Sequence, residues 1–335
     1  MNGEDLARGR AARAMPPRRA HWRDYLRMAR LDHMTKHVFI LPGLVLAWML
    51  REPPMEGALW RIGLGLASAV AVASANYLLN EWLDRAFDAF HPDKSARPAV
   101  NASLSPLCVW SAYALASLLG LALAGEVGPL FFATSLLFWL SGVVYNVRPL
   151  RAKDQPFLDV LCESFNNPLR LMLGWAMLEE ATLAPASLLL AYWMGGAFLM
   201  GAKRLSEYRE IAAGPGLAVL HRYRASFRGY TEERLLVSCF VYALLSTLLL
   251  GFFLVKYRIE YLVACPFVIA MFAHYLSLSL RAGSVAQKPE KLFREKRLMA
   301  ISGLTLVAVV TLSFVNLPRL KALTEPHYLK LERRP

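Results

Sequence analysis

Long apolar runs separated by short polar segments dominate the hydropathy pattern of this 335-residue chain. A helix needs about 20 consecutive apolar residues to cross the hydrocarbon core of a bilayer. A window of about 19 residues finds nine candidate spans. They cover residues 38–50 with flanks, 62–80, 107–124, 129–147, 157–178, 184–202, 235–255, 259–280 and 299–317. The pattern therefore predicts an all-α integral membrane bundle of about nine transmembrane helices.

The composition supports one membrane domain. Hydrophobic residues make up 56% of the chain, charged residues only 19%, and the mean hydropathy is +0.35. This composition excludes a disordered chain, and the four widely spaced cysteines argue against a zinc site or a disulfide framework. Residues 1–37 lack the apolar core of a cleavable signal peptide. We expect a disordered basic arm at 1–21, a single membrane domain at 22–317 and a C-terminal tail at 318–335.

The net charge of +13 has two interpretations, nucleic-acid binding or membrane orientation. The distribution of charge favours the second. Placing the N-terminus in the cytoplasm puts 28 of the 38 Lys and Arg residues in segments 1–37, 80–106, 146–157, 203–234 and 281–298. Basic residues gather in the cytoplasmic loops of membrane proteins, although the basic tail does not fit this pattern. We expect a multi-pass protein of the bacterial inner membrane, with a cytoplasmic N-terminus and no nucleic-acid partner.

Polar side chains recur along one face of the second run. Asn76, Asn80, Asp84 and Asp88 are spaced four residues apart, which aligns them on a helix. Together with Glu81 they crowd carboxylates at a helix end, and oxygen-only ligands favour Mg²⁺ over zinc. Mg²⁺ held by one or two carboxylates completes its shell with water and substrate phosphates. The alternative is an ordinary solvated helix end, which would not explain the deeper asparagines.

Basic residues in the following loop complement this acidic face. Lys94 and Arg97 lie in the segment His91–Pro98, between two prolines. A carboxylate-bound metal flanked by cations is the arrangement that a diphosphate needs. The alternative is that both residues only contribute to the positive-inside charge.

A second polar stripe crosses the fifth run. At 100° per residue, Asp159, Glu163, Asn166 and Arg170 fall within an arc of roughly 60°. A stripe of this kind is too costly to face lipid, so it lines a cavity or pairs inside the bundle. A structural Glu163–Arg170 ion pair is the alternative to a functional role. A basic loop precedes this run and contains Tyr145, Arg148, Arg151 and Lys153.

The sixth run ends in a segment of mixed charge. Lys203 and Glu207 lie four residues apart on one helix face, with Arg204 beside them. Such a segment would close the polar chamber opposite Asp84 and Asp88. A simple basic stop after a membrane span is the alternative interpretation.

These motifs resemble the UbiA superfamily of membrane prenyltransferases over about residues 22–300. The similarity rests on Asn80-x-x-x-Asp84-x-x-x-Asp88 followed by His-Pro-x-Lys94-x-x-Arg97-Pro. Within the superfamily the chain is most similar to the decaprenyl-phosphate phosphoribosyltransferase branch. The motifs of that branch are an entry segment with Arg30, Lys36, Phe39 and Pro42, the Lys203-Arg204-x-x-Glu207 segment, and a late loop with Pro289, Glu290, Leu292 and Leu298.

The chain departs from the family pattern at three positions. Aromatic prenyltransferases of the family carry a second Asp-rich motif after the sixth span, where this chain has Lys203-Arg204-x-x-Glu207. A basic segment there suits a donor with a phosphate in addition to its diphosphate. Glu81 replaces the usual Asp, and His37 replaces the Asn typical of the branch.

The resemblance implies transfer of 5-phosphoribose from phosphoribosyl diphosphate to a polyprenyl phosphate of the decaprenyl kind, with Mg²⁺ as cofactor and membrane lipids as surroundings. Asn80, Asp84 and Asp88 would hold the metal, and Asp159 and Glu163 would meet the ribose hydroxyls or a second metal. The expected substrate-binding residues are Lys36, Tyr77, Asn80, Lys94, Arg97, Tyr145, Arg148, Arg151, Lys153, Arg170, Lys203 and Arg204, with Glu207 orienting Lys203. Alternatives are an aromatic prenyltransferase and, less favoured, a lipid carrier. The oligomeric state stays open.

Overall fold

The computed structural model describes residues 18–91, 94–281, 283–284 and 295–320, without the side chains of residues 32–36. The α-helices are α2 (Trp22–Met28), α3 (Leu41–Arg51), α4 (Ala58–Asp88), α5 (Pro98–Asn101), α6 (Pro106–Val127), α7 (Pro129–Asn146), α8 (Leu158–Ala176), α9 (Ala186–Ala213), α10 (Leu217–Tyr223), α11 (Glu232–Tyr257), α12 (Cys265–Ser279) and α13 (Lys296–Phe314). Short 3₁₀ segments are η1 (Leu31–Ile40), η2 (Lys94–Ala96), η3 (Ala152–Asp154), η4 (Ala225–Gly229) and η5 (Ile259–Ala264). The strands β1 (Arg18–Arg19) and β2 (Ala102–Ser103) form one short parallel pair.

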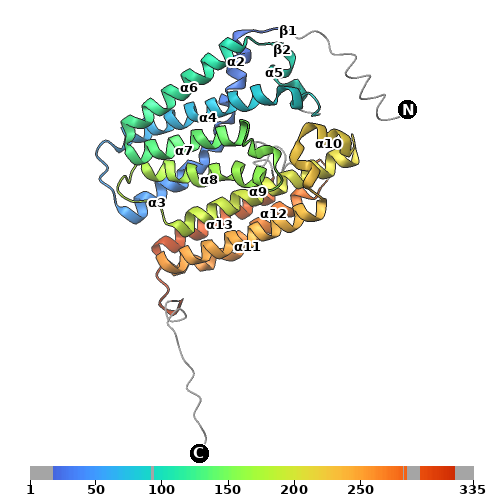
Figure 1. Ribbon diagram of the computed structural model, residues 1–335. Helices are drawn as coiled ribbons and strands as arrows, with labels where there is room; N and C mark the ends of the chain where they lie inside the picture. The colour runs from blue at the N-terminus through green and yellow to red at the C-terminus, as the bar shows by residue number, and fades with distance from the viewer. Residues whose placement is uncertain (1–17, 92–93, 282, 285–294, 321–335) are drawn as a thin grey trace, which may run out of the picture.

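The long helices lie side by side as one bundle (Figure 1). α4, α6 and α7 contact one another, α8 contacts α3, α7 and α9, and α11 packs along α9. Proline in the first turn begins α3, α6, α7 and α12, where its missing N–H leaves no helical hydrogen bond unmade. The short elements α5, α10 and β2 gather at one end of the bundle, where the polar ends of α4 and α9 also lie. The all-α fold is thereby confirmed.

Six helical segments in the described residues are long and apolar enough to cross a membrane, namely α4, α6, α7, α11, η5 with α12, and α13. Their outward faces carry large apolar side chains such as Leu118, Phe252 and Leu306, as expected for contact with lipid. The three other predicted runs also form helices, but α3 has only 11 residues and α8 and α9 carry the charged residues of the site. The chain is a multi-pass membrane protein, and the count of nine spans stays a prediction.

Two glycines allow a close contact between α8 and the segment that leads into α3. A Cβ added to Gly174 would lie 2.0 Å from the carbonyl oxygen of Ile40. A Cβ added to Gly43 would lie 1.9 Å from the carbonyl oxygen of Leu171. These neighbours are backbone atoms, so a side chain at either position forces the helices apart. This contact positions the middle of α8, and with it the polar stripe.

Gly174→Ala should therefore destabilise the fold by about 1–3 kcal/mol through overpacking. Gly251 of α11 is a matched control because a Cβ there meets no atom within 4 Å. Gly251→Ala should be neutral or stabilising by up to about 1 kcal/mol, since Ala favours a helix over Gly. Thermal unfolding in detergent measures both variants. Equal melting temperatures for the two would contradict the close contact.

Candidate active site

A cavity of about 830 Å³ opens inside the bundle between α4, α7, α8 and α9. One end is polar and is lined by the C-terminal part of α4, the loops that contain η2 and η3, and the segment after α10. The other end is apolar and is lined by side chains of α9 and α11, such as Leu188 and Leu250, while Phe272 of α12 and Leu298 of α13 line an apolar side wall. The cavity therefore suits a ligand with an anionic head and a hydrocarbon tail.

The polar face of α4 lines the cavity as the spacing predicts, through Asn76, Asn80, Asp84 and Asp88. Asp84 accepts hydrogen bonds from Arg151 Nη2 at 2.9 Å and forms an ion pair with Lys153 Nζ at 2.5 Å. Asp88 forms an ion pair with Arg97. Each carboxylate is thus presented beside a cation from a different loop.

Glu81 does not belong to this face. Its side chain is buried, 3.4 Å from Arg30 Nη2, and it accepts from the backbone N–H of Ala99 at 3.4 Å. Glu81 is absent from the cavity lining, whereas its partner Arg30 is part of it. Glu81 thus forms an ion pair with Arg30, next to η1, and accepts from the backbone of α5, and it does not take part in the predicted crowding of three carboxylates.

The loop after α7 turns two of its three basic residues inward. Arg151, whose backbone is left-handed at φ 30°, donates to Asp154 Oδ2 at 2.8 Å and to the carbonyl oxygen of Asn146 at 3.2 Å. Strained backbone held by several contacts is typical of functional sites. Lys153 is buried, and burial lowers its pKa to about 8 although Asp84 favours the charged form. Arg148 is exposed and does not line the cavity, because the chain reverses before Arg151.

The loop after α4 places Lys94 and Arg97 at the cavity. Lys94 donates to the hydroxyl of Tyr223, and its ammonium lies 4.3 Å from the centre of that ring. Burial lowers the pKa of Lys94 to about 7, against the opposing attraction of Glu207. Lys94 is therefore a cation whose charge changes near neutral pH.

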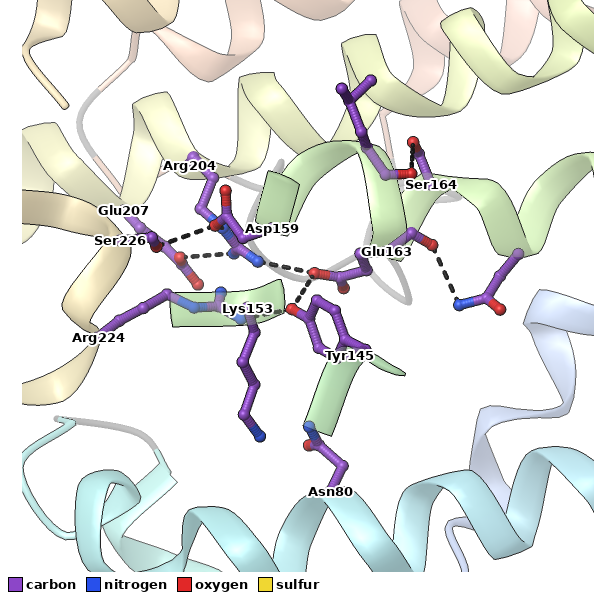
Figure 2. A network of polar contacts seen from close by, with 12 residues as sticks. Asn80, Tyr145, Lys153, Asp159, Glu163, Ser164, Arg204, Glu207, Arg224 and Ser226 are labelled. Atoms are coloured by element: carbon purple, nitrogen blue, oxygen red, sulfur yellow. Dashed lines mark hydrogen bonds and ion pairs between the residues drawn. The ribbon is translucent and has the colours of Figure 1, made fainter. Parts of the chain in front are cut away.

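Arg204 lies at the centre of a buried ion-pair cluster (Figure 2). Its guanidinium donates to Asp159 at 3.0 Å, Glu163 at 2.7 Å and Glu207 at 2.9 Å. Tyr145 donates to Glu163 at 2.9 Å and accepts from Arg224. The stripe on α8 thus pairs with α9, and no ion pair joins Glu163 to Arg170 among the described residues.

Asp159 serves as an anchor for the segment after α10. It is fully buried and accepts from Ser226 at 3.0 Å and Tyr230 at 2.5 Å in addition to Arg204. Neither Asp159 nor Glu207 lines the cavity, whereas Glu163 and Arg204 do. The geometry leaves Asp159 no free oxygen for ribose hydroxyls or a second metal, and Glu207 pairs with Arg204.

The remaining predicted residues divide between the two ends of the cavity. Lys203 and Tyr145 line its polar end, and Tyr77 and Arg170 line its deeper part. Lys36 falls in η1, but its side chain lies outside the described residues, as does the late-loop segment that contains Pro289, Glu290 and Leu292.

The structure also adds site residues that the sequence interpretation did not single out. Arg30, Asn146, Tyr223 and Arg224 line the cavity. In the sequence, Arg30 is distinguished only as part of the entry motif. Arg224 is one of the positive-inside charges of the loop at 203–234, and no spacing rule distinguishes it from its neighbours there.

The donor set at α4 fits a magnesium ion that binds together with a phosphorylated substrate. No group of three His, Cys, Asp or Glu side chains in the described residues forms a metal cage. Asp84, Asp88 and Asn80 nevertheless offer oxygen ligands to the same cavity. Mg²⁺ usually takes one or two carboxylates and fills its octahedron with water and phosphate oxygens. Nitrogen or sulfur ligands are absent from this set.

Known proteins of related fold were found for most of the chain. A UbiA homologue from Archaeoglobus fulgidus bound to GPP and Mg²⁺ has a TM-score of 0.63 and 24% identity, covering 87% of this chain and 100% of that one. Digeranylgeranylglyceryl phosphate synthase has a TM-score of 0.59 and 13% identity, covering 87% and 98%. At these identities the likeness establishes the fold.

Two curated relatives match parts of the sequence. Nodulation protein NoeC of Azorhizobium caulinodans is 30% identical over 189 residues, 56% of this chain and 58% of that protein. A 4-hydroxybenzoate octaprenyltransferase of Cupriavidus necator is 30% identical over 127 residues, 37% and 42% of the two chains. The match thus spans about half the length of these relatives. The sequence pattern of the UbiA prenyltransferase family matches residues 38–317, and the chain belongs to that family.

Proposed function

We propose that the protein transfers 5-phosphoribose from phosphoribosyl diphosphate to a polyprenyl phosphate and releases diphosphate. The observation that carries this proposal is the ion pairing of the carboxylates opposite Asp84 and Asp88. Asp159, Glu163 and Glu207 all pair with Arg204, so among the described residues the far side of the cavity favours a basic site over a second metal site. A donor with two separate anionic groups fits one metal site and one basic site.

The excess of positive charge in the cavity supports the binding of two substrates that together carry several anionic groups. Among the described residues that line it, nine are Lys or Arg and four are Asp or Glu. A single isoprenyl diphosphate would leave much of this positive charge without a partner. Phosphoribosyl diphosphate together with a lipid phosphate would supply three anionic groups, which balance it better.

In the proposed reaction a phosphate oxygen of the lipid attacks C1 of the ribose. A new C1–O bond forms, the bond from C1 to the diphosphate oxygen breaks, and the diphosphate departs with the electron pair. Mg²⁺ bound with Asp84, Asp88 and Asn80 would supply charge neutralisation for the departing diphosphate. Lys94 and Arg97 would bind its outer oxygens, and Lys203 would bind the 5-phosphate. A lipid phosphate is already anionic at neutral pH, so no protein base is needed.

The charge distribution supports a membrane orientation for the proposed site. Lys94, Lys153, Lys203 and Arg224 all come from loops or helix ends that belong to the segments predicted to be cytoplasmic. We place the polar mouth of the cavity at the cytoplasmic face of a bacterial inner membrane, where the water-soluble donor is available. The lipid chain would then leave through the apolar end, between the spans.

An aromatic prenyltransferase is the second candidate. The partial similarity to a 4-hydroxybenzoate octaprenyltransferase and the structural likeness to a GPP-bound homologue favour it. In that case the apolar end would hold an isoprenyl diphosphate, and the acceptor would be an aromatic acid.

Removal of either carboxylate on α4 tests the metal assignment. Asp84→Asn and Asp88→Asn should each lower Mg²⁺-dependent turnover by at least about 100-fold, the scale of lost transition-state charge stabilisation. Glu81→Gln is the matched control on the same helix, because Glu81 does not line the cavity. Its Mg²⁺ dependence should equal that of the wild type. An Asn variant that kept more than about a tenth of the activity at saturating Mg²⁺ would remove that residue from the site.

The donor is tested by offering two substrate pairs to the purified protein. We expect labelled lipid from phosphoribosyl diphosphate with polyprenyl phosphate, and none from polyprenyl diphosphate with an aromatic acid. Lys203→Ala should raise the KM for phosphoribosyl diphosphate by roughly 10- to 100-fold, since charged hydrogen bonds are worth about 1.5–3 kcal/mol. Arg209→Ala, at an exposed position of the same helix, is the control. Product from the second pair alone would favour the aromatic prenyltransferase.

The lowered pKa of Lys94 predicts a specific pH dependence. Lys94 is cationic below about pH 7 and neutral above it, so kcat/KM for the donor should fall as the pH rises through about 7 to 8. With donor bound, its negative charge favours the ammonium form, and kcat should stay flat to about pH 8.5. Lys94→Arg should abolish the alkaline fall in kcat/KM, because arginine keeps its charge. An unchanged profile in that variant would exclude Lys94 from donor binding.

A further inference from the structure

A second buried arginine, Arg170, lies deep in the cavity. It belongs to the same helix pair as the Arg204 cluster but differs in its surroundings. The side chain of Arg204 is 2% exposed and pairs with three carboxylates. Arg170 is also buried, at 8% exposure. No carboxylate of the described residues forms an ion pair with it, and its Nε has no hydrogen-bond partner.

The groups around Arg170 are mainly tyrosines. Tyr77 of α4 and Tyr192 of α9 interact with it electrostatically, and so does Glu163, which is itself paired with Arg204. The guanidinium lies over the ring of Phe138, 5.1 Å from its centre. Asn76 donates to the carbonyl oxygen of Phe138, and its buried Oδ1 has no partner among the described residues. The described part of this layer therefore has hydrogen-bonding groups that a ligand could use.

An unpaired guanidinium inside a membrane protein is costly. Polar residues at such depth pair with one another or mark a ligand pathway. Because no carboxylate of the described residues forms an ion pair with Arg170, an anionic ligand would supply the counter-ion that it lacks. Arg170, Tyr77, Asn76 and Tyr192 all line the cavity, so that ligand has access to them.

The position of Arg170 relates it to the proposed reaction. Tyr77 precedes Asp84 by seven residues on α4, which is about 10 Å along the helix axis. Arg170 therefore lies one layer deeper than the metal-binding carboxylates. Beyond it, Leu188 and Ala191 of α9 and Leu250 of α11 line the apolar end of the cavity. An anion held by Arg170 would thus carry its hydrocarbon chain directly into that apolar end.

We propose that Arg170 binds the phosphate of the polyprenyl phosphate acceptor. This inference rests on the proposed function and assigns separate sites to the two substrates. The donor lies between Asp84 and Lys203, and the acceptor phosphate lies against Arg170 with Tyr77 and Tyr192 beside it. The planar guanidinium binds two phosphate oxygens at once and leaves the third to attack C1. The new C1–O bond forms as the bond from C1 to the diphosphate breaks, and no proton is transferred.

The test separates acceptor binding from donor binding. Arg170→Met should raise the KM for polyprenyl phosphate by about 10- to 100-fold, the effect of losing charged hydrogen bonds, and change the KM for phosphoribosyl diphosphate by less than about threefold. Lys203→Ala is the matched control with the opposite pattern. A purely structural role would not divide the two KM values in this way. An unchanged KM for the lipid, or a raised KM for the donor alone, would overturn the inference.

Binding is also measured without the donor, so that failure of the proposed function can be recognised. Polyprenyl phosphate alone, added in detergent, should raise the melting temperature of the wild type and not that of Arg170→Met. If this difference is found but phosphoribosyl diphosphate gives no product, the acceptor site stands and the proposed function fails. If polyprenyl phosphate stabilises both proteins equally, the inference fails. If Arg170→Met instead loses only the binding of an aromatic acid, the inference fails as well.

The choice of substitution guards the test against a loss of folding. Arg170→Met removes an unpaired charge, so its melting temperature without ligand should equal or exceed that of the wild type. Should Arg170→Met not be recovered as folded protein, Arg170→Lys replaces it. Lysine keeps the charge but loses the planar fork, and we expect an approximately tenfold higher KM for the lipid phosphate. A KM equal to that of the wild type would overturn the assignment.

Discussion

The ion-pair cluster around Arg204 is the interaction on which the active-site architecture depends. It joins α8 to α9 through Asp159, Glu163 and Glu207. Through Ser226 and Tyr230, the carboxylate of Asp159 also fastens the segment after α10. Removing one member of a buried cluster leaves uncompensated charge and costs several kcal/mol. The cluster is therefore as much a constraint on the fold as a feature of the site.

The same cluster decides which charges remain for ligands. A guanidinium that binds three carboxylates can offer little to a phosphate, and carboxylates held by it can offer little to a metal. The ligand-binding character of the cavity thus comes from residues outside the cluster. On one side these are Asp84 and Asp88, each next to a loop cation. On the other side they are Lys203 and Arg224, which give that wall its basic character.

The hydropathy pattern predicted the helices well, because lipid contact requires long apolar faces that leave a clear signal. The four-residue spacing of Asn76, Asn80, Asp84 and Asp88 also predicted a shared helix face, and in the structure that face lines the cavity. The ion-pair partner of each charged side chain was less predictable. Glu81 follows Asn80 in sequence but faces Arg30, and Arg148 lies near Arg151 but stays exposed. The spacing along one helix says nothing about which neighbouring helix supplies the partner, and tertiary contacts alone determine that.

The contrast between two arginines shows what such pairing means for function. The sequence predicts a substrate-binding role for both Arg170 and Arg204. In the structure they differ, because Arg204 pairs with three carboxylates. Arg170 instead lies near two tyrosines and over an aromatic ring. Burial of a charge in a bundle is tolerated when a counter-charge is built in, and otherwise favours a site that a ligand completes. The depth of Arg170 then places its ligand between the metal-binding carboxylates and the apolar end of the cavity. At this position an anionic lipid can bind Arg170 through its head group and place its hydrocarbon chain in the apolar end.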